Sequence, residues 1–353
     1  MRQKMRAANE PYINPMRIFL ILLLLCSACE KPLRPPHVQP LLQHWPKPYK
    51  GVAKLKLHVF KTGEISVPKR VVYRGGSFLE TFLLDVLVFA IEHPHQGIIL
   101  VGTGLSRGVI SGAESYLGTF RTALGSLSVD EGQDILSQLE SADLSVDKVR
   151  NIILLDLRFS HTGELENFPQ AQVMVSSAEY TAAMEEGESA LSISDEYDGV
   201  KQWQLIDFTD PQPLGTFSAH RDVFGDGSVL VIDVSGATPG GLAVLVRLPR
   251  SPVLLCGNLA WTAEQAQYVR EPGFVFNRQS WWENAWKLKK FTELAPELVV
   301  LPDHDWDAVN AIKTKDIIVH AFPTPEGSDS QEEQEDAPAK EKKRESPNQK
   351  RSG

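Results

Sequence analysis

The sequence predicts an α/β fold in which layers of β-sheet pack together and are flanked by helices. Short apolar runs, typical of buried strands, fall into two groups along the chain. Segments with helical spacing of apolar residues are interspersed with these runs, which favours a layered sandwich with helices outside. A chain of 353 residues, 42% of them hydrophobic, can bury one large core or two modest ones.

The first group of predicted strands occupies the N-terminal half of the chain. KLKLHVF alternates as a strand does, and the longer apolar stretch 77–94 contains one or two strands. The predicted elements that follow are strands at 97–104, 148–157 and 171–177, with helices at 131–142 and 178–187.

The second group lies in the C-terminal half and is separated by turns rather than helices. Three strands are predicted in SVLVIDV, GLAVLVRL and SPVLLCGN. An amphipathic helix is predicted at 280–294, and the last two strands at 297–302 and 316–322.

The N-terminal residues 1–28 predict an export signal. Arg17 precedes IFLILLLL, a run too short to span a bilayer comfortably but suited to a signal peptide, and Met16 is an alternative start. Ser27 and Ala28 before Cys29 resemble a bacterial lipobox, which implies cleavage before Cys29 and lipid on its sulfur. An uncleaved anchor or a plain secretory signal is the alternative.

The rest of the chain divides into three predicted parts. Residues 29–50 are rich in proline and indicate an extended tether. Residues 51–322 hold the strands and helices of the globular domain. Residues 323–353 nearly lack apolar side chains and predict a disordered charged tail; a contact with peptidoglycan or a partner is the functional alternative.

Charge and cysteine content restrict the possible partners. The net charge is −9, and residues 1–28 are themselves basic, so the remainder is more acidic still, which argues against nucleic acid. Once Cys26 leaves with the signal and Cys29 carries lipid, only Cys256 remains. No intramolecular disulfide is then expected, and Cys256 is predicted to be a small core residue.

Five segments in order resemble the metallo-β-lactamase-fold superfamily, nearest its lactonase-like branch. They are IILVGTG, LSVDKVRNIILLDLRFSHTGELENFP, FGDGSVLVIDVSGATPGGLAVLV, VLLCGNLAW and ELVVLPDHDW. The resemblance covers roughly residues 51–322 and implies a four-layer αββα sandwich, with two mixed sheets between outer helices. It further implies that the turns at 102–104, 156–161, 235–240, 258 and 304 meet at one edge.

The resemblance also assigns the family's metal-ligand positions, most of which are altered in this sequence. The altered positions are Asp156, Arg158, Ser160, Ala237 and Asn258, whereas His161 and His304 are retained. Arginine is a permanent cation and alanine has no donor atom, so the first of two zinc sites should be lost. The sequence therefore predicts no cofactor, or at most one zinc ion held weakly by His161, His304 and Asp156, with Asp303 or Asp305 as further candidates.

Arg158 is predicted to point inward and to pair with Asp156 in place of the lost metal, where it could bind a small anionic ligand. Solvent exposure is the alternative for Arg158, and a structural role is the alternative for His161 and His304.

The main functional hypothesis is a lipid-anchored, non-catalytic binding or scaffold module. The alternatives are a metal-dependent hydrolase of ester, lactone or lactam bonds with a reduced single-metal site, and a structural envelope protein. Cys29 implies the lipid bilayer as a partner and a bacterial cell-envelope location, with the domain in the periplasm.

Overall fold

The computed structural model describes residues 33–37, 41–117, 125–185 and 191–322. The predicted signal at 1–28 and the predicted tail at 323–353 lie outside these residues. Most of the predicted tether is included, and it is attached to the domain by the backbone pair Gln43 and Gly215.

The first sheet combines antiparallel and parallel strands in the order β14-β1-β2-β3-β5-β6-β7, with β4 paired to β1. Its strands are β1 (Lys56–Pro68), β2 (Thr81–His93), β3 (Gly97–Val101), β4 (Ser126–Ser128), β5 (Val149–Ile153), β6 (Gln172–Ser176), β7 (Trp203–Ile206) and β14 (Ile317–His320). The stretch predicted as one or two strands at 77–94 is the single strand β2.

The second sheet is also mixed and has the order β13-β12-β11-β10-β9-β8. Its strands are β8 (Gln212–Leu214), β9 (Phe217–Asp222), β10 (Val229–Asp233), β11 (Leu242–Arg247), β12 (Pro252–Leu255) and β13 (Val299–Leu301). Only β12 and β13 pair in parallel, because a helical connection joins them.

Helices join the strands and cover the outer faces of both sheets. They are α2 (Lys69–Val72), α3 (Ala113–Leu117), α5 (Ile135–Ser141), α6 (Phe159–Thr162), α7 (Ser177–Glu185), α8 (Ala263–Tyr268), α9 (Arg278–Leu294) and α10 (Trp306–Asn310), with 3₁₀ turns η2 (Arg107–Ser111), η3 (Val146–Lys148), η4 (Leu165–Asn167), η5 (Ser194–Glu196) and η6 (Gly257–Leu259). In the described part of the chain, no helix is long and apolar enough to span a bilayer.

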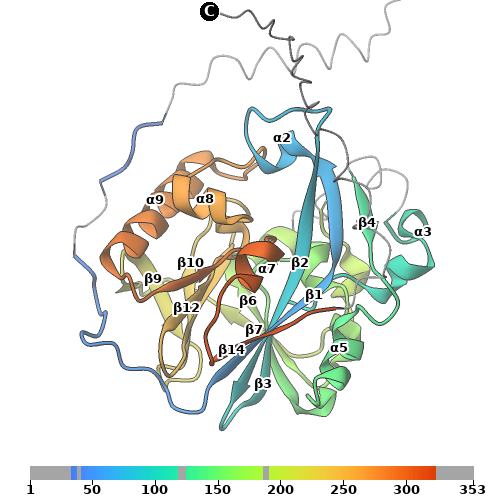
Figure 1. The fold of residues 1–353 in the computed structure, drawn as a ribbon, viewed down its shortest axis with the longest axis horizontal. Helices are drawn as coiled ribbons and strands as arrows, with labels where there is room; N and C mark the ends of the chain where they lie inside the picture. Colours follow the sequence, from blue (N-terminus) through green and yellow to red (C-terminus); the bar gives the residue numbers. More distant parts are fainter. Residues whose placement is uncertain (1–32, 38–40, 118–124, 186–190, 323–353) are drawn as a thin grey trace, which may run out of the picture. The chain divides into compact units, whose positions relative to one another are not determined.

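Three apolar layers hold the sandwich together, as the alternation along the strands requires. The central layer lies between the sheets and joins Val59 and Phe89 of the first sheet to Val231 and Val244 of the second. One outer layer packs α5 against the first sheet, and the other packs α9 against the second. This order of helix, sheet, sheet and helix confirms the predicted four-layer arrangement (Figure 1).

Candidate functional site

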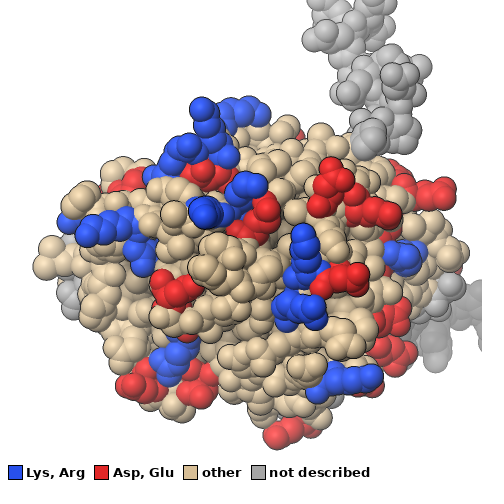
Figure 2. Space-filling view, turned by 90° about the horizontal axis from the view of Figure 1, so that it is seen from below, with Lys and Arg blue, Asp and Glu red and all other residues tan. Residues whose placement is uncertain are grey.

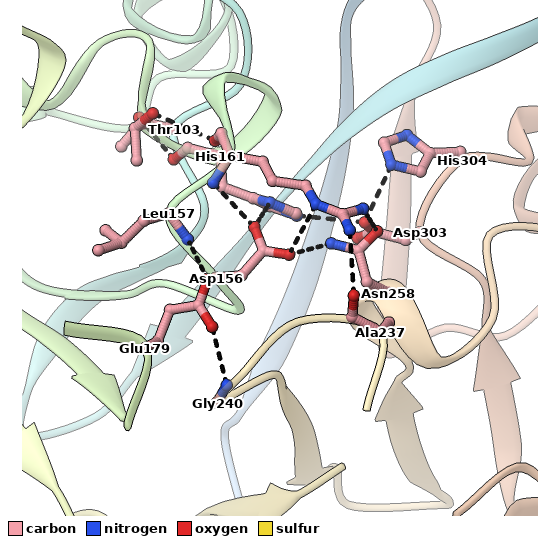
Figure 3. Close-up of polar contacts among 12 residues, drawn as sticks. Thr103, Asp156, Leu157, His161, Glu179, Ala237, Gly240, Asn258, Asp303 and His304 are labelled. Carbon is pink, nitrogen blue, oxygen red and sulfur yellow. Dashed lines mark hydrogen bonds and ion pairs between the residues drawn. The ribbon is translucent and has the colours of Figure 1, made fainter. Parts of the chain in front are cut away.

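The ends of strands from both sheets meet at one edge of the sandwich, and polar side chains gather there (Figure 3). Asp156 follows β5, Asn258 lies in η6 after β12, and His304 follows β13. Ala237 lies in the turn between β10 and β11. The hydrogen bonds that join these segments confirm that the turns named from the sequence converge.

Asp156 is fully buried and accepts hydrogen bonds on both carboxylate oxygens. Its Oδ1 accepts from the Arg158 backbone N–H at 3.0 Å and from His161 Nδ1 at 2.8 Å. Its Oδ2 accepts from the Asn258 amide. Burial alone would raise the pKa of Asp156, but the His161 and Arg158 cations lower it below its usual range. Asp156 is therefore a fixed anion that organises the loop.

His161 lies on α6 between two carboxylates and is almost inaccessible to solvent. Its Nδ1 contacts Asp156, and its Nε2 donates to Asp303 Oδ2 at 3.1 Å. Burial opposes a positive imidazole, but Asp303 and Asp156 together raise the pKa of His161 to about 10. His161 is therefore an imidazolium at neutral pH, with both N–H groups donating to carboxylates.

Arg158 directs its side chain inward, toward Asn258 and the Ala237 carbonyl, as predicted. Nη1 donates to Asn258 Oδ1 at 3.0 Å, Nη2 donates to the Ala237 carbonyl at 3.3 Å, and Nε lies 3.7 Å from Asp156 Oδ2. The guanidinium also lies 5.8 Å from the centre of the Trp261 ring. These contacts hold a permanent cation that remains partly accessible to solvent, with a side-chain exposure of 16%.

His304 lies beside His161, with 6.4 Å between the ring centres. Nδ1 donates to the Asp85 backbone carbonyl at 2.7 Å, and Nε2 lies 3.2 Å from Asp303 Oδ2. Burial lowers the pKa of His304, while the Asp303 carboxylate opposes that effect. His304 is thus the neutral imidazole of the pair.

Backbone geometry next to β3 fixes the position of His161. Gly102 adopts φ 72°, which L side chains rarely adopt, and a Cβ at this position would lie 3.3 Å from His161 Cδ2. Thr103 then donates from its backbone N–H and its hydroxyl to the His161 carbonyl, at 2.7 and 2.9 Å. The glycine turn predicted at 102–104 therefore holds the loop at 156–161.

Two carboxylates of the site were missed or undervalued by the sequence interpretation. Asp303 was only a secondary candidate, yet it contacts His161 and His304, and its Oδ1 is buried without a hydrogen-bond partner in the described part of the chain. Glu179 on α7 accepts from the backbone N–H groups of Leu157 and Gly240, at 3.4 and 2.8 Å. Burial and the nearby Asp156 raise the pKa of Glu179. No motif marks Glu179, because its partners belong to distant loops.

The candidate ligands His161, His304 and Asp156 do not point at a common centre. Asp156 contacts Nδ1 of His161, whereas Asp303 and then His304 lie on the side of Nε2. Ser160 is buried on the same short helix. Across residues 33–322, where described, no group of three or more histidine, cysteine, aspartate or glutamate residues is placed so that it could hold a metal ion.

Comparison with curated proteins finds relatives among the N-acyl homoserine lactonases, whereas no family model matches the chain. The lactonase AttM of Rhizobium radiobacter is 26% identical over 259 residues, which is 72% of this chain and 94% of AttM. AttM of Azorhizobium caulinodans is 24% identical over 264 residues, covering 73% of this chain and 96% of the relative.

Solved structures give the same fold. An N-acyl homoserine lactone hydrolase with N-hexanoyl-L-homoserine at its catalytic metal centre is 19% identical, with a TM-score of 0.63 over 74% of this chain and 97% of that one. A quorum-quenching N-acyl homoserine lactone lactonase is 18% identical, with a TM-score of 0.59 over 74% and 96%.

These comparisons correct two expectations drawn from the sequence. The hypothesis of a non-catalytic binding or scaffold module is wrong, because similarity to lactonases extends over nearly their whole length. The expectation of no cofactor, or of one zinc ion at most, is also wrong, because the structural relative binds its product at a catalytic metal centre. Both errors came from giving the altered motif positions more weight than the similarity of the whole domain, on which the hydrolase alternative rested.

Proposed function

We propose that this chain, which has the metallo-β-lactamase fold and N-acyl homoserine lactonases as sequence relatives, hydrolyses lactone or ester bonds at the pocket around Arg158. The observation that carries the proposal is the similarity to the AttM lactonases over 72% of this chain and 94% of the relative. N-acyl homoserine lactones are accordingly the first substrates to test. The convergence of polar side chains at one edge of the sandwich supports the same location.

The metal centre that the fold family implies is a separate question, and the side chains present do not fit two zinc ions. The Arg158 guanidinium has no lone pair and lies between Asn258 and the Ala237 carbonyl, both at motif positions. Ala237 offers no side-chain donor, and Asn258 is neutral where the family has a bridging carboxylate. These side chains depart from the family's ligand pattern, and the steps below are therefore assigned to the chain's own side chains.

Arg158 is the group that faces the reacting carbonyl in this proposal. A fixed guanidinium in a partly desolvated pocket stabilises the negative charge that develops on the carbonyl oxygen and then on the carboxylate product. Asn258 Oδ1 accepts from both Arg158 and the Trp261 indole N–H, which limits the orientations open to the guanidinium. The site is thus preorganised before substrate binds.

His304 is the group placed to accept a proton from water. Its Nδ1 proton is held by the Asp85 carbonyl, which leaves Nε2 as the basic nitrogen, and Asp303 Oδ2, 3.2 Å from Nε2, stabilises the proton once Nε2 has accepted it. Water loses a proton to Nε2 and adds to the carbonyl carbon. The ring C–O bond then breaks, and the proton returns to the alkoxide, which gives a hydroxy acid. His161 cannot serve in this role because both its nitrogens already donate to carboxylates.

Ring opening by the purified full chain tests the proposal. Acid release is followed in a pH-stat with short- and long-chain N-acyl homoserine lactones and a simple aryl ester, before and after chelator treatment and with added zinc, cobalt or manganese. The expected result is turnover of a lactone under at least one metal condition. Absence of turnover of every substrate under every metal condition would overturn the proposal.

A histidine substitution tests where the reaction takes place. His304→Gln should lower the rate by about 100-fold, the usual size of a lost general base. His220→Gln is the matched control, because His220 Nδ1 also donates to a backbone carbonyl, at 2.6 Å, but lies on β9 away from the pocket. Equal rates in the two variants would remove His304 from the mechanism.

A further inference from the structure

Two neighbouring loops carry large apolar side chains that face solvent. Phe78 and Leu79 lie between α2 and β2 and are 60% and 97% exposed, and Phe274 and Phe276 lie between α8 and α9 and are 66% and 65% exposed. Single exposed apolar residues are ordinary, but a cluster of them usually marks a contact surface. These four residues are called the apolar loop pair below.

Backbone and side-chain contacts hold the two loops together. The Arg74 backbone N–H donates to the Glu271 carbonyl at 2.8 Å, and Gly273 N–H donates to the Val71 carbonyl at 2.9 Å. The side chains of Arg74 and Glu271 form an ion pair at 2.9 Å. In Figure 1, α2 and the loop that precedes α9 both lie at the upper end of the domain. The apolar loop pair is therefore one surface on a fixed scaffold.

The described N-terminal segment runs beside this surface. The Trp282 indole N–H donates to the Arg34 carbonyl at 3.0 Å, and Trp282 lies near the start of α9, directly after the second loop. Cys29 precedes Arg34 by five residues, and the apolar run IFLILLLL ends nine residues before it. Fully extended, chain segments of five and nine residues span at most about 18 Å and about 32 Å. Either form of the N-terminal anchor expected from the sequence would keep the apolar loop pair close to the bilayer.

The charge around the apolar loop pair differs from that of the whole chain. Segments 69–80 and 264–278 together carry five basic and three acidic residues, whereas the chain has a net charge of −9. Arg70 lies over the Phe78 ring, 5.2 Å from its centre. On the opposite, lower face, basic and acidic side chains are interspersed (Figure 2). The other four basic residues of these segments form ion pairs with the acidic ones, so Arg70 beside the apolar side chains is the cation placed to meet the interface of a bilayer that contains anionic lipids.

We propose that the apolar loop pair docks on the surface of a bilayer that contains anionic lipids, and thereby orients the domain on its membrane. The aromatic rings enter the headgroup region, and Arg70, beside Phe78, faces lipid phosphates. The Ala237 carbonyl accepts from Arg158 and also from the Phe276 backbone N–H at 3.2 Å, so the docking surface adjoins the pocket. The site around Arg158 then lies beside the layer in which amphiphilic molecules concentrate. The docking proposal does not depend on the proposed hydrolysis.

Photo-crosslinking of the full chain tests the docked orientation. Benzoylphenylalanine is placed at Leu79 or Phe276 in separate variants, and the chain is reconstituted in vesicles of phosphatidylethanolamine and phosphatidylglycerol. The matched control carries the same group at Leu205, which is 45% exposed on β7 of the first sheet. Because all variants share the N-terminal segment, the experiment separates orientation from simple attachment.

The expected result is at least 10-fold more lipid crosslinking at positions 79 and 276 than at position 205. Replacing phosphatidylglycerol with phosphatidylcholine should lower that yield about threefold. Equal lipid yields at the three positions would overturn the proposal. Two further outcomes would also overturn it: crosslinks mainly to a second copy of the chain, or lipid crosslinks abolished by an N-acyl homoserine lactone, which would make these residues an acyl-chain subsite.

Discussion

Two buried histidines in the same sheet sandwich differ in charge, since one is positive and the other neutral, and their neighbours explain the difference. His161 lies between Asp156 and Asp303, both almost completely buried, and its pKa is raised to about 10. His58 on β1 is also buried, but its Nδ1 contacts His320 at 2.9 Å, and its carboxylate neighbour Glu92, at 3.3 Å, is partly exposed. Burial lowers the pKa of His58, although Glu92 opposes this effect.

The contrast shows that burial does not by itself fix the charge of an imidazole. Desolvation favours the neutral form at both positions, and only the two desolvated carboxylates beside His161 reverse it. At the pocket, the cations Arg158 and His161 balance the anions Asp156 and Asp303. The β1 site needs no such balance because its imidazoles are neutral. The predictions below test this difference from the largest expected effect to the smallest.

Replacing His161 should destabilise the protein far more than the same change at His58. His161→Leu leaves Asp156 and Asp303 buried without the cation between them, which costs on the order of 3–5 kcal/mol. His58→Leu removes one neutral hydrogen-bonding group and should cost about 1 kcal/mol. Urea unfolding at pH 7 measures both free energies. Losses of similar size would show that His161 is not a charged partner of the two carboxylates.

The two histidines should also change stability in opposite pH ranges. The folded pKa of His161 lies above its unfolded value of 6.5, so its contribution is complete below that pH and is lost as pH rises toward 10. The folded pKa of His58 is lowered, so its cost appears as pH falls below 6.5. Urea midpoints measured from pH 5 to 10 check this. His161→Leu should reduce the fall of the midpoint at alkaline pH, and His58→Leu should reduce the fall at acidic pH. The account fails if His161→Leu leaves the fall at alkaline pH unchanged.

Removing the indole N–H of Trp261 should have a small effect on stability. Trp261→Phe keeps an aromatic ring near Arg158 but deletes the hydrogen bond to Asn258 Oδ1. A loss of about 1 kcal/mol in unfolding free energy is expected, the usual contribution of one hydrogen bond. Trp45→Phe is the control, because its Nε1 donates to Glu297 at 2.8 Å outside the pocket. A lactone KM that changes in Trp261→Phe but not in Trp45→Phe would place the indole at the substrate.

Much of the fold could be predicted from the sequence because buried strands are apolar and regularly spaced. The edge strand β8 was missed because Gln212–Leu214 has only three residues and contains a proline, and β7 because its exposed face breaks the alternation. The inward contact between Arg158 and Asp156 was predictable from charge. The roles of Asp303 and Glu179 were not, because their partners lie 142 and 61 residues away in the chain. Counting lost ligands also gave the wrong function, since a donor count bears on which metal fits and not on which bond is cleaved.

The initial rate of lactone ring opening in Arg158→Ala tests most directly whether the pocket around Arg158 is the reaction site. The matched control is Arg221→Ala, because Arg221 lies 3.7 Å from Asp207 and 5.8 Å from the Phe208 ring centre, distances equal to those of Arg158 from Asp156 and Trp261. With the metal that supports wild-type turnover, Arg158→Ala should lose about 100-fold in kcat/KM, as a missing oxyanion donor does, and Arg221→Ala should stay within about twofold. A rate in Arg158→Ala equal to that of the control would contradict the account.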